Sequence, residues 1–365
     1  MNLTSDAVTE RYRPHGMSRR HLLFSLPAVI AAPRVFAADD PPIRARGINH
    51  VTLSVSDVKR SVDFYQGLFG MPITSRQGMT TNLRIGAGPQ FLGVSAAGSN
   101  PPSINHFCLA VDNFNVDRIT SALSRRGLTR SDAAGNAGTG GLGGPLRMRV
   151  RVRGPEAGGD RPGTPELYFS DPDGIVVQLQ DARYCGGSGP FGNVCPPSEA
   201  APKKGLLSLR DWSHCTIFVS DSVRSNMFYW ELFGLRVQAH QGPTAPVLEA
   251  GKGVQFLMFG GGGGAARGTN AAPRPAAINH LCMSVERFNP DAVIKALESY
   301  GIKPRGSAQG AAGPLVHYIS MRMENRGGAK EGTPELYFTD PDGLLIQLQD
   351  VKYCGGAGIL GEVCS

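Results

Sequence analysis

The stretch Ser56-Asp57-x-x-Arg60-Ser61-x-x-Phe64-Tyr65-x-x-Leu68-Phe69-Gly70 recurs, position by position, at residues 220–234. A second stretch, Gly163-Thr164-Pro165-Glu166-Leu167-Tyr168-Phe169 followed by Asp171-Pro172-Asp173-Gly174, recurs at residues 332–343. Two long repeats in the same order are typical of a tandem duplication. The sequence therefore predicts two homologous domains, residues 43–195 and 207–365, joined by a linker over residues 196–206.

Each copy contains a weaker internal duplication of a β-branched, alternating segment. Such alternation predicts strands, and four of them begin the four modules: residues 48–55, 104–111, 212–219 and 278–285. After the first strand, Ser56 or Asp57 is an expected helix N-cap and Gly70 an expected helix end. The predicted order is β-α-β-β-β, twice per domain, which makes the fold class α+β.

A strand carrying His, a helix ending in Phe-Tyr-x-x-Leu-Phe-Gly and a final hairpin through Asp-Pro-Asp-Gly together resemble the vicinal oxygen chelate superfamily. This superfamily includes glyoxalases, extradiol dioxygenases, fosfomycin-resistance enzymes and bleomycin-binding proteins. The resemblance covers nearly all of the chain after the N-terminal segment, twice. It implies that paired βαβββ modules form a cupped, mixed and antiparallel sheet around a divalent metal ion.

The resemblance also implies the metal ligands, which are carried over position by position. The first strand of each module provides a histidine, and the strand after the Asp-Pro-Asp-Gly hairpin provides a glutamine where the family usually has Glu. The expected ligands are His50, His106 and Gln178 in the first domain and His214, His280 and Gln347 in the second. The fourth-strand position, Glu in glyoxalases, has no acid here, in residues 90–94 or 255–259.

Histidine usage supports these sites independently of the resemblance. Of the six histidines that follow residue 37, four occupy the duplicated strand positions. Imidazoles suit Fe²⁺, Mn²⁺, Ni²⁺ and Zn²⁺, of which Fe²⁺ is favoured here. A neutral glutamine oxygen would leave the ion more electrophilic and favour an anionic, chelating substrate. The alternative is a degenerate, metal-free pocket. His317, which aligns with Met148, is expected to be structural.

Tyr168 and Tyr337 precede the two hairpins and resemble a substrate-binding Tyr of the extradiol dioxygenase signature. A histidine expected a few residues upstream in that signature is absent. Glu166 and Glu335 share a strand face with these tyrosines by period-two alternation, so each is a candidate general base or extra ligand. The alternative is a strand Tyr packed in the core beside a surface Glu.

These features favour a metal-dependent enzyme that acts on a small substrate chelated through vicinal oxygens, with dioxygenase-type oxidation as the preferred reaction. The alternatives are a glyoxalase-like isomerase or lyase acting on a sugar or keto acid, and a non-catalytic small-molecule-binding protein. Because both halves keep the same His/His/Gln set, two equivalent sites are expected. Neither the substrate nor the oligomeric state follows from the sequence.

The N-terminus has a twin-arginine pattern at Arg19-Arg20, a short apolar run and small residues up to Ala37. It predicts a signal for the Tat export machinery over residues 1–37, too short for a stable membrane anchor, and a periplasmic or secreted protein. The cysteine pairs 185/195 and 354/364 recur in matching Gly-rich segments, which in an oxidising compartment predicts two disulfide-closed loops. Cys108, Cys215 and Cys282 are expected to be buried thiols. A net charge of +7 without a basic stripe argues against nucleic-acid binding.

Overall fold

A computed structural model describes residues 41–365 apart from four gaps, residues 134–140, 243–244, 262–274 and 308–311. The expected signal segment, residues 1–37, lies outside the described residues. Residues 37–365 form one compact unit. No helix in the described part of the chain is long and apolar enough to cross a membrane.

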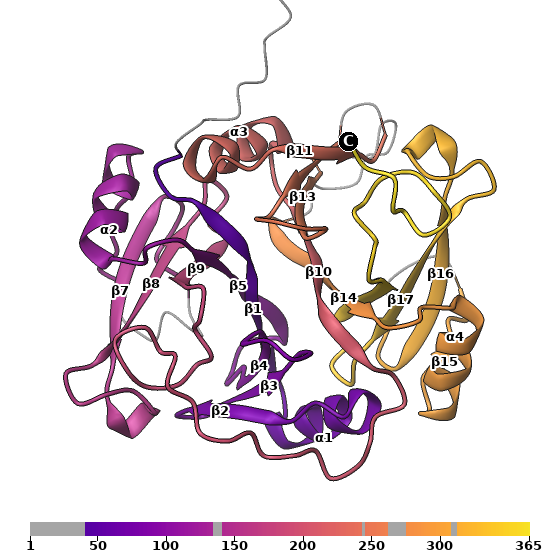
Figure 1. Ribbon diagram of the computed structural model, residues 1–365, viewed down its shortest axis with the longest axis horizontal. Helices are drawn as coiled ribbons and strands as arrows, with labels where there is room; N and C mark the ends of the chain where they lie inside the picture. Colours follow the sequence, from indigo (N-terminus) through magenta and orange to yellow (C-terminus); the bar gives the residue numbers. More distant parts are fainter. Residues whose placement is uncertain (1–40, 134–140, 243–244, 262–274, 308–311) are drawn as a thin grey trace, which may run out of the picture. The chain divides into compact units, whose positions relative to one another are not determined.

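The described residues form two nine-stranded mixed sheets with helices beside them, so the expected α+β class is confirmed (Figure 1). The first sheet has the order β2-β3-β4-β1-β5-β9-β8-β7-β6, and the second the equivalent order β11-β12-β13-β10-β14-β18-β17-β16-β15. In each sheet the two modules meet where their first strands pair antiparallel, β1 with β5 and β10 with β14. We refer to residues 43–195 as the first half and residues 207–365 as the second half.

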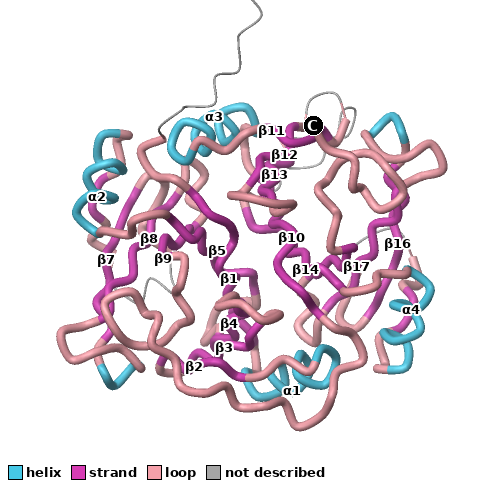
Figure 2. The backbone as a smooth tube through the Cα atoms, in the orientation of Figure 1, coloured by secondary structure: helices cyan, strands magenta, loops and turns pink. Residues whose placement is uncertain are grey.

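The elements of the first half are β1 (Ala45–Val55), α1 (Val58–Phe69), β2 (Ile73–Gln77), β3 (Thr80–Arg84), β4 (Phe91–Ala96), β5 (Ser103–Val111), α2 (Val116–Arg125), β6 (Thr129–Arg130), β7 (Arg147–Arg153), β8 (Thr164–Ser170) and β9 (Val176–Asp181). Those of the second half are β10 (Leu209–Phe218), α3 (Ser222–Phe233), β11 (Val237–His240), β12 (Pro246–Glu249), β13 (Phe256–Gly260), β14 (Ala277–Val285), α4 (Pro290–Ser299), β15 (Lys303–Pro304), β16 (Val316–Arg322), β17 (Thr333–Thr339) and β18 (Leu345–Asp350). A short 3-10 turn follows β7 and β16 in turn. Figure 2 shows the same path coloured by secondary structure.

Helix α1 begins and ends where the sequence predicts. The Asp57 side chain accepts a hydrogen bond from the backbone N–H of Arg60, which satisfies one of the free N–H groups of the first turn. Gly70 ends the helix with a left-handed φ of 66°, a conformation that costs glycine little. Asp221 and Gly234 do the same for α3.

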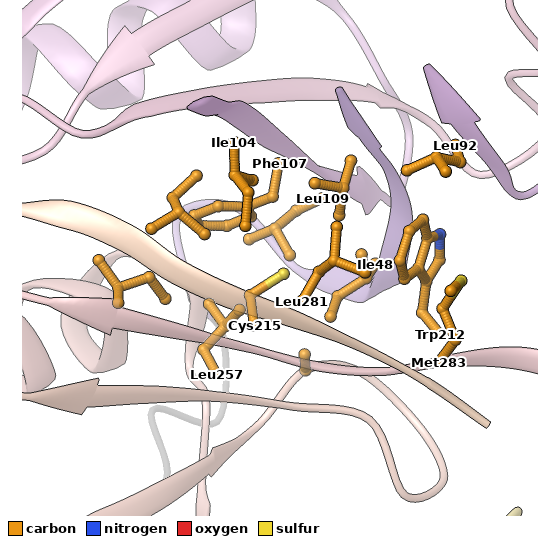
Figure 3. Close-up of a cluster of buried hydrophobic side chains, with 14 of the residues drawn as sticks. Ile48, Leu92, Ile104, Phe107, Leu109, Trp212, Cys215, Leu257, Leu281 and Met283 are labelled. Atoms are coloured by element: carbon orange, nitrogen blue, oxygen red, sulfur yellow. The ribbon is translucent and has the colours of Figure 1, made fainter. Parts of the chain in front are cut away.

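A single hydrophobic core joins the two sheets. Ile48, Phe107 and Leu109 of the first half belong to the same buried cluster as residues of the second half, among them Trp212, Leu281 and Met283. Figure 3 shows side chains from both sheets packed in this cluster. Val51 and Phe107 also belong to this core, and because side chains alternate across a strand, His50 and His106, which directly precede them, project from the opposite faces of the strands.

The hairpin of each half clasps the helix of the other half. Asp342 accepts hydrogen bonds from the backbone and hydroxyl of Ser56 and pairs with Arg60, while the hydroxyl of Tyr65 donates to Asp340 (3.1 Å). The equivalent contacts join Asp173 to Ser220 and Arg224, and Asp171 to Tyr229. The two most obvious repeated motifs of the sequence therefore bind each other in pairs across the molecule. We call these contacts the hairpin clasps.

The predicted linker lies along the first sheet. Glu199 forms two backbone hydrogen bonds with Ile73 of β2, each 2.8 Å long, and its side chain pairs with Arg76. The disulfides Cys185–Cys195 and Cys354–Cys364 are formed, so the predicted pairs are confirmed. Cys108, Cys215 and Cys282 are buried and free, also as expected.

Candidate metal centres

Each half carries one row of side chains that runs across its sheet, strand by strand. In the first half, register pairs connect β4, β1, β5, β9, β8 and β7 through Phe91, His50, Cys108, Gln178, Tyr168 and Arg149. The matching row of the second half is Phe256, His214, Cys282, Gln347, Tyr337 and Tyr318. Because residues in register share a face, these rows place a histidine and a glutamine of each predicted site on the same side of the sheet.

A break in strand register precedes each of the four histidines. On β1 the pairing shifts at Asn49, immediately before His50, and on β5 it shifts at Asn105, immediately before His106. Ser213 and Asn279 take the same position in the second half. A β-bulge re-aims a side chain, so the bulged residue can face the histidine that follows it.

In the first half, each bulged asparagine forms a hydrogen bond with the Nδ1 atom of the histidine that follows it. Asn49 Oδ1 lies 2.8 Å from His50 Nδ1, and Asn105 Oδ1 lies 2.8 Å from His106 Nδ1. The Asn49 amide donates its N–H to the backbone oxygen of Tyr184, which fixes its oxygen toward His50. A carbonyl oxygen at Nδ1 selects the tautomer protonated there, leaving the Nε2 lone pair exposed on the other side of the ring.

The two free Nε2 atoms converge on one amide oxygen. Gln178 Oε1 lies 3.0 Å from His50 Nε2 and 3.1 Å from His106 Nε2. All three atoms are acceptors, so no hydrogen bond can join them in this arrangement, and the Gln178 amide nitrogen has no partner. Two ligand atoms that each lie about 2.1 Å from one ion, with a ligand–ion–ligand angle of about 90°, are about 3 Å apart. The observed spacing therefore fits a divalent ion bound by these atoms.

The second half repeats this arrangement with one change. Gln347 Oε1 lies 3.0 Å from His214 Nε2, and the Nε2 atoms of His214 and His280 are 3.3 Å apart. Asn279 Oδ1 lies 2.8 Å from His280 Nδ1, but His214 Nδ1 faces the Ser213 hydroxyl at 3.1 Å. No cluster of three or more His, Cys, Asp or Glu side chains occurs among the residues with described positions, because the third member of each set is an amide.

Burial keeps all four histidines neutral. It lowers the pKa of His106 and of His280 to about 4. Burial also lowers the pKa of His50 and His214 well below the usual value, with a contribution from the neighbouring histidine. Burial also raises the pKa of the Cys108 thiol well above its usual value, so this sulfur stays protonated and is a poor metal ligand.

Aromatic rings that the sequence analysis did not single out form the walls of each centre. Phe91 stacks on His50 with ring centroids 4.3 Å apart, and Tyr184 stacks on the same ring at 5.6 Å. Phe91 is the β4 partner of His50, so a phenyl ring occupies the place in the row where a fourth ligand would enter. In the sequence, Tyr184 and its counterpart Tyr353 could have been recognised because each begins a repeated Tyr-Cys-Gly-Gly segment.

Glu166 is held by a buried network and is not free to act as a base. Its carboxylate accepts hydrogen bonds from Arg153 Nε (2.9 Å) and from the hydroxyls of Tyr184 (2.8 Å) and Tyr168 (3.2 Å). Glu335 is held equivalently by Arg322, Tyr353 and Tyr337. We therefore revise the general-base interpretation of both glutamates: each holds two tyrosine hydroxyls beside a candidate metal centre.

Arg153 and Arg322, also missed in the sequence, tie each centre to its disulfide loop. Both side chains are fully buried, and Arg153 donates to the backbone oxygens of Gly187 (2.7 Å) and Ala157 (3.1 Å). Arg322 bonds Gly356 and Gly327 in the same way. For Arg153 the signal was the alternation Arg149-Val150-Arg151-Val152-Arg153, which puts arginine on one strand face; the equivalent residues before Arg322 show no such alternation. His317, by contrast, lies outside both rows and pairs with Glu298.

The donor atoms are shielded from solvent. His50, His106, Gln178 and Tyr168 are each at most 3% exposed, and Leu142 packs on Tyr168. A cavity of about 550 Å³ between the halves is lined by Asn105 and Asn279, the partners of two of the histidines, but by none of the donors. The donors therefore do not open onto this cavity.

Residues 47–179 match the model of the Glyoxalase/Bleomycin resistance protein/Dioxygenase superfamily. The first half contains a domain of this superfamily. The matched segment includes both bulged histidine strands and Gln178. No curated protein matches the sequence.

Solved structures of this superfamily align with both halves of the chain. The Mn(II)-bound glyoxalase from Novosphingobium aromaticivorans is 15% identical, has a TM-score of 0.51 and aligns over 84% of this chain and 82% of its own. Homoprotocatechuate 2,3-dioxygenase from Arthrobacter globiformis is 15% identical with a TM-score of 0.52, over 86% and 81%. The 2,3-dioxygenase LapB from Pseudomonas sp. KL28 is 13% identical with a TM-score of 0.54, over 83% and 92%. These similarities establish the shared fold.

Proposed function

We propose that each half of this protein binds one divalent metal ion through two histidine Nε2 atoms and one glutamine oxygen. The observation that carries the proposal is the convergence of Gln178 Oε1 on two Nε2 atoms, 3.0 Å from that of His50 and 3.1 Å from that of His106, while the Nδ1 atom of each ring faces an asparagine oxygen. Because these three ligands are neutral, none of them would offset the charge of the ion, and its full charge would act on the substrate. Fe²⁺ is the favoured ion, and Mn²⁺, Ni²⁺ and Zn²⁺ are alternatives.

The reaction supported best is dioxygenase-type oxidation of a small substrate that coordinates through two neighbouring oxygens. Two histidines and one oxygen donor, with a phenyl ring in the fourth-ligand direction, leave adjacent coordination positions for such a substrate, as in non-haem iron oxygenases. A bound ion would polarise the substrate oxygens and favour their deprotonation. Structural neighbours include both extradiol dioxygenases and a glyoxalase, so isomerase or lyase chemistry is the second candidate.

The tyrosines and glutamates then orient the substrate and do not exchange protons with it. Burial and the Glu166 charge raise the pKa of Tyr168 well above its usual value, so its hydroxyl remains a donor. The ring of Tyr168 lies edge-on to His106, with centroids 5.6 Å apart, which places the ring beside the proposed centre, while its hydroxyl donates to Glu166. Arg153 balances the Glu166 charge and keeps the carboxylate from competing for the ion.

We also propose that the chain is exported through the Tat machinery. The twin arginines at 19 and 20 support this, as do two disulfides that would be stable outside the cytoplasm. Since Tat carries folded proteins, an ion could be loaded before export.

Elemental analysis of the purified protein tests the metal assignment. The wild-type chain should bind two ions, and the variant His50→Ala/His106→Ala should bind one. The matched control His317→Gln removes a buried histidine outside the rows and should keep two. Gln178→Glu should tighten binding in the first half by about tenfold, about 1.4 kcal/mol, because a carboxylate neutralises part of the ionic charge. Unchanged stoichiometry in the double histidine variant would refute the assignment.

Oxygen consumption then separates the candidate reactions. Fe²⁺-loaded protein should consume dioxygen with catechols, and His50→Ala/His106→Ala/His214→Ala/His280→Ala should not. Turnover of a keto sugar without oxygen uptake would instead favour the isomerase. Tight ligand binding that survives loss of all four histidines would favour a non-catalytic binding protein.

A further inference from the structure

A cavity of about 790 Å³ lies between the two halves, and we call it the charged cavity. The first half contributes the segment at the end of α1, with Phe69 and Met71, and the end of β3, with Arg84. The second half contributes the start of β10, with Leu209, and Glu286 directly after β14. None of the six proposed metal ligands lines this cavity, so it is a separate candidate site.

Arg84 brings a positive charge to the cavity without a partner. Its Nε atom is buried and has no hydrogen-bond partner. Among the residues whose positions are described, no carboxylate pairs with its guanidinium, and no side chain or backbone oxygen accepts from it. The terminal N–H groups of such a guanidinium can bind both oxygens of a carboxylate. Arg84 is therefore suited to a ligand that carries an acid group.

Glu286 brings a negative charge that is also unpaired. Its backbone N–H donates to Ser208, but its carboxylate has no ion pair or hydrogen bond within the described part of the chain, and it does not reach Arg84. Two further charged residues line the cavity, Arg210 and Asp211. Burial raises the pKa of Asp211, and the positive charge of Arg210 opposes this rise, so these two charges offset each other. One positive and one negative side chain are left without a partner.

A second cavity, of about 270 Å³, takes the equivalent place at the end of α3 and the start of β1. Both cavities are closed by a glycine turn against the backbone of the other half. A Cβ atom on Gly86 would lie 2.0 Å from the backbone oxygen of Arg210, and one on Gly251 would lie 2.2 Å from that of Arg46. The backbones of the two cavities are thus built alike, and their difference comes from the side chains.

In the smaller cavity the protein itself pairs the charge at the position of Arg84. Glu249 of β12 takes that register position, and its carboxylate lies 3.6 Å from the guanidinium of Arg236. The residue equivalent to Arg236 is Pro72 in the first half, so Arg84 has no counterpart of this ion pair. Both members of the pair line the smaller cavity.

The position of Glu286 shows the same contrast. Its equivalent in the first half is Asp112, which pairs with Arg46. Arg210 is the equivalent of Arg46, yet it forms no ion pair with Glu286. Two charges that are satisfied by the protein at one cavity are therefore left for a ligand at the other.

We propose that the charged cavity binds a small zwitterionic amino acid, with its carboxylate on Arg84 and its ammonium group on Glu286. A ligand with both charges satisfies both side chains, whereas a simple acid would meet the Glu286 charge and a simple amine the Arg84 charge. The apolar side chains of Phe69, Met71 and Leu209 in the same lining suit the hydrocarbon part of such a molecule. The volume lies in the range of small-molecule sites.

Titration calorimetry on the full-length protein tests the two ends of the ligand separately. Leucine and its isomer 6-aminohexanoate carry both charges at different spacings, while hexanoate and hexylamine carry one charge each. At least one of the amino acids should bind about tenfold more tightly than either single-charge probe. Arg84→Gln should weaken amino-acid binding about tenfold and leave hexylamine binding unchanged, and Glu286→Gln should weaken it similarly without weakening hexanoate binding.

Arg236→Gln is the matched control, because it breaks the ion pair of the smaller cavity and should leave amino-acid affinity unchanged. Since Arg84 has no partner, Arg84→Gln should unfold at the temperature of the wild-type protein when no ligand is added, which separates a lost site from a misfolded chain. The bound amino acid should raise the Tm of the wild type and not that of Arg84→Gln. No amino-acid binding, equal binding in both proteins, or hexanoate binding as tight as the amino acids would each overturn the proposal.

Discussion

At the scale of single residues, the pair formed by a bulged Asn or Ser and the following His determines the chemistry of each centre. The bulge turns the Asn49 side chain to the same side as His50, and its oxygen fixes the proton on Nδ1. Without the bulge, neighbouring strand residues would point to opposite faces. In the Asn-His pair, the asparagine therefore keeps the proton on Nδ1, so that the lone pair of Nε2 faces the candidate centre.

The buried histidines make the metal-free protein sensitive to acid. A histidine whose folded pKa lies below 6.5 is neutral in the folded state and protonated when unfolded, so its contribution to stability is lost as pH falls from 6.5 toward the folded value. A drop to about 4 for His106 and His280 corresponds to about 3 kcal/mol each. Asp171 and Asp340 act in the opposite direction, because burial raises their pKa to about 6 and the folded state gains stability as they protonate.

These two pairs nearly cancel, which leaves His50 and His214 to set the balance. We expect the urea midpoint of metal-free protein to fall between pH 7 and pH 5, and the variant His50→Gln/His214→Gln to show little or none of this fall. The measurement is equilibrium unfolding after dialysis against a chelator. An identical pH dependence in the variant would show that other groups are responsible.

At the scale of elements, the hairpin clasps explain why the helix and hairpin motifs are repeated so faithfully. Asp173 accepts from the backbone and side chain of Ser220 and pairs with Arg224, although its own hairpin belongs to the other half. These contacts lower the pKa of Asp173 despite partial burial, so the carboxylate is charged at neutral pH. The N-terminus of α3 further favours this negative charge.

Removing a clasp should destabilise the whole protein. Asp173→Ala leaves the Ser220 N–H and the Arg224 guanidinium without their acceptor, and we expect a loss of about 1–3 kcal/mol in the free energy of unfolding. Asp342→Ala should cost a similar amount. The exposed Asp132→Ala is the control, with an expected change below about 0.5 kcal/mol. If Asp173→Ala left the free energy of unfolding unchanged in chemical denaturation, the clasp would not stabilise the protein.

At the scale of the whole molecule, the two halves share one core and are therefore expected to depend on each other. The apolar faces around Ile48, Phe107 and Leu109 are covered by the sheet that carries Trp212 and Leu281. The Trp212 indole N–H also donates to the backbone oxygen of Asn49, the bulged residue before His50 (3.2 Å). Packing between the halves thus reaches directly to the support of a metal centre.

Expression of the halves as separate chains tests this dependence. Residues 41–206 alone would expose an apolar sheet face and should aggregate or self-associate, while co-expression with residues 207–365 should restore a soluble, metal-binding complex. Size-exclusion chromatography with elemental analysis provides the readout. A monomeric, folded first half with its full metal content would contradict the shared-core account.

Repetition within the sequence was sufficient to predict the first strand of each module, the ends of the first helix of each half and the disulfide pairs, whereas the six proposed ligands came from the resemblance to the vicinal oxygen chelate superfamily. Periodicity indicates which face of an element is apolar. An Asp at the N-cap indicates where a helix begins, and a glycine after the last turn indicates where it ends. The two-residue edge strand β6 was not among the predicted strands, because so short a segment carries little periodic signal. The histidines of the predicted sites stood out because each occurs at an equivalent position of a repeated strand.

Only the tertiary structure decided which partners those faces and motifs meet. The strand pattern predicts on which face Glu166 lies, but it does not predict that Arg153 will pair with it. Likewise, the repeated helix and hairpin motifs do not reveal that the helix of each half binds the hairpin of the other half. Periodicity is a local property of the chain, whereas ion pairs, clasps and charge at a site depend on contacts between residues far apart in sequence.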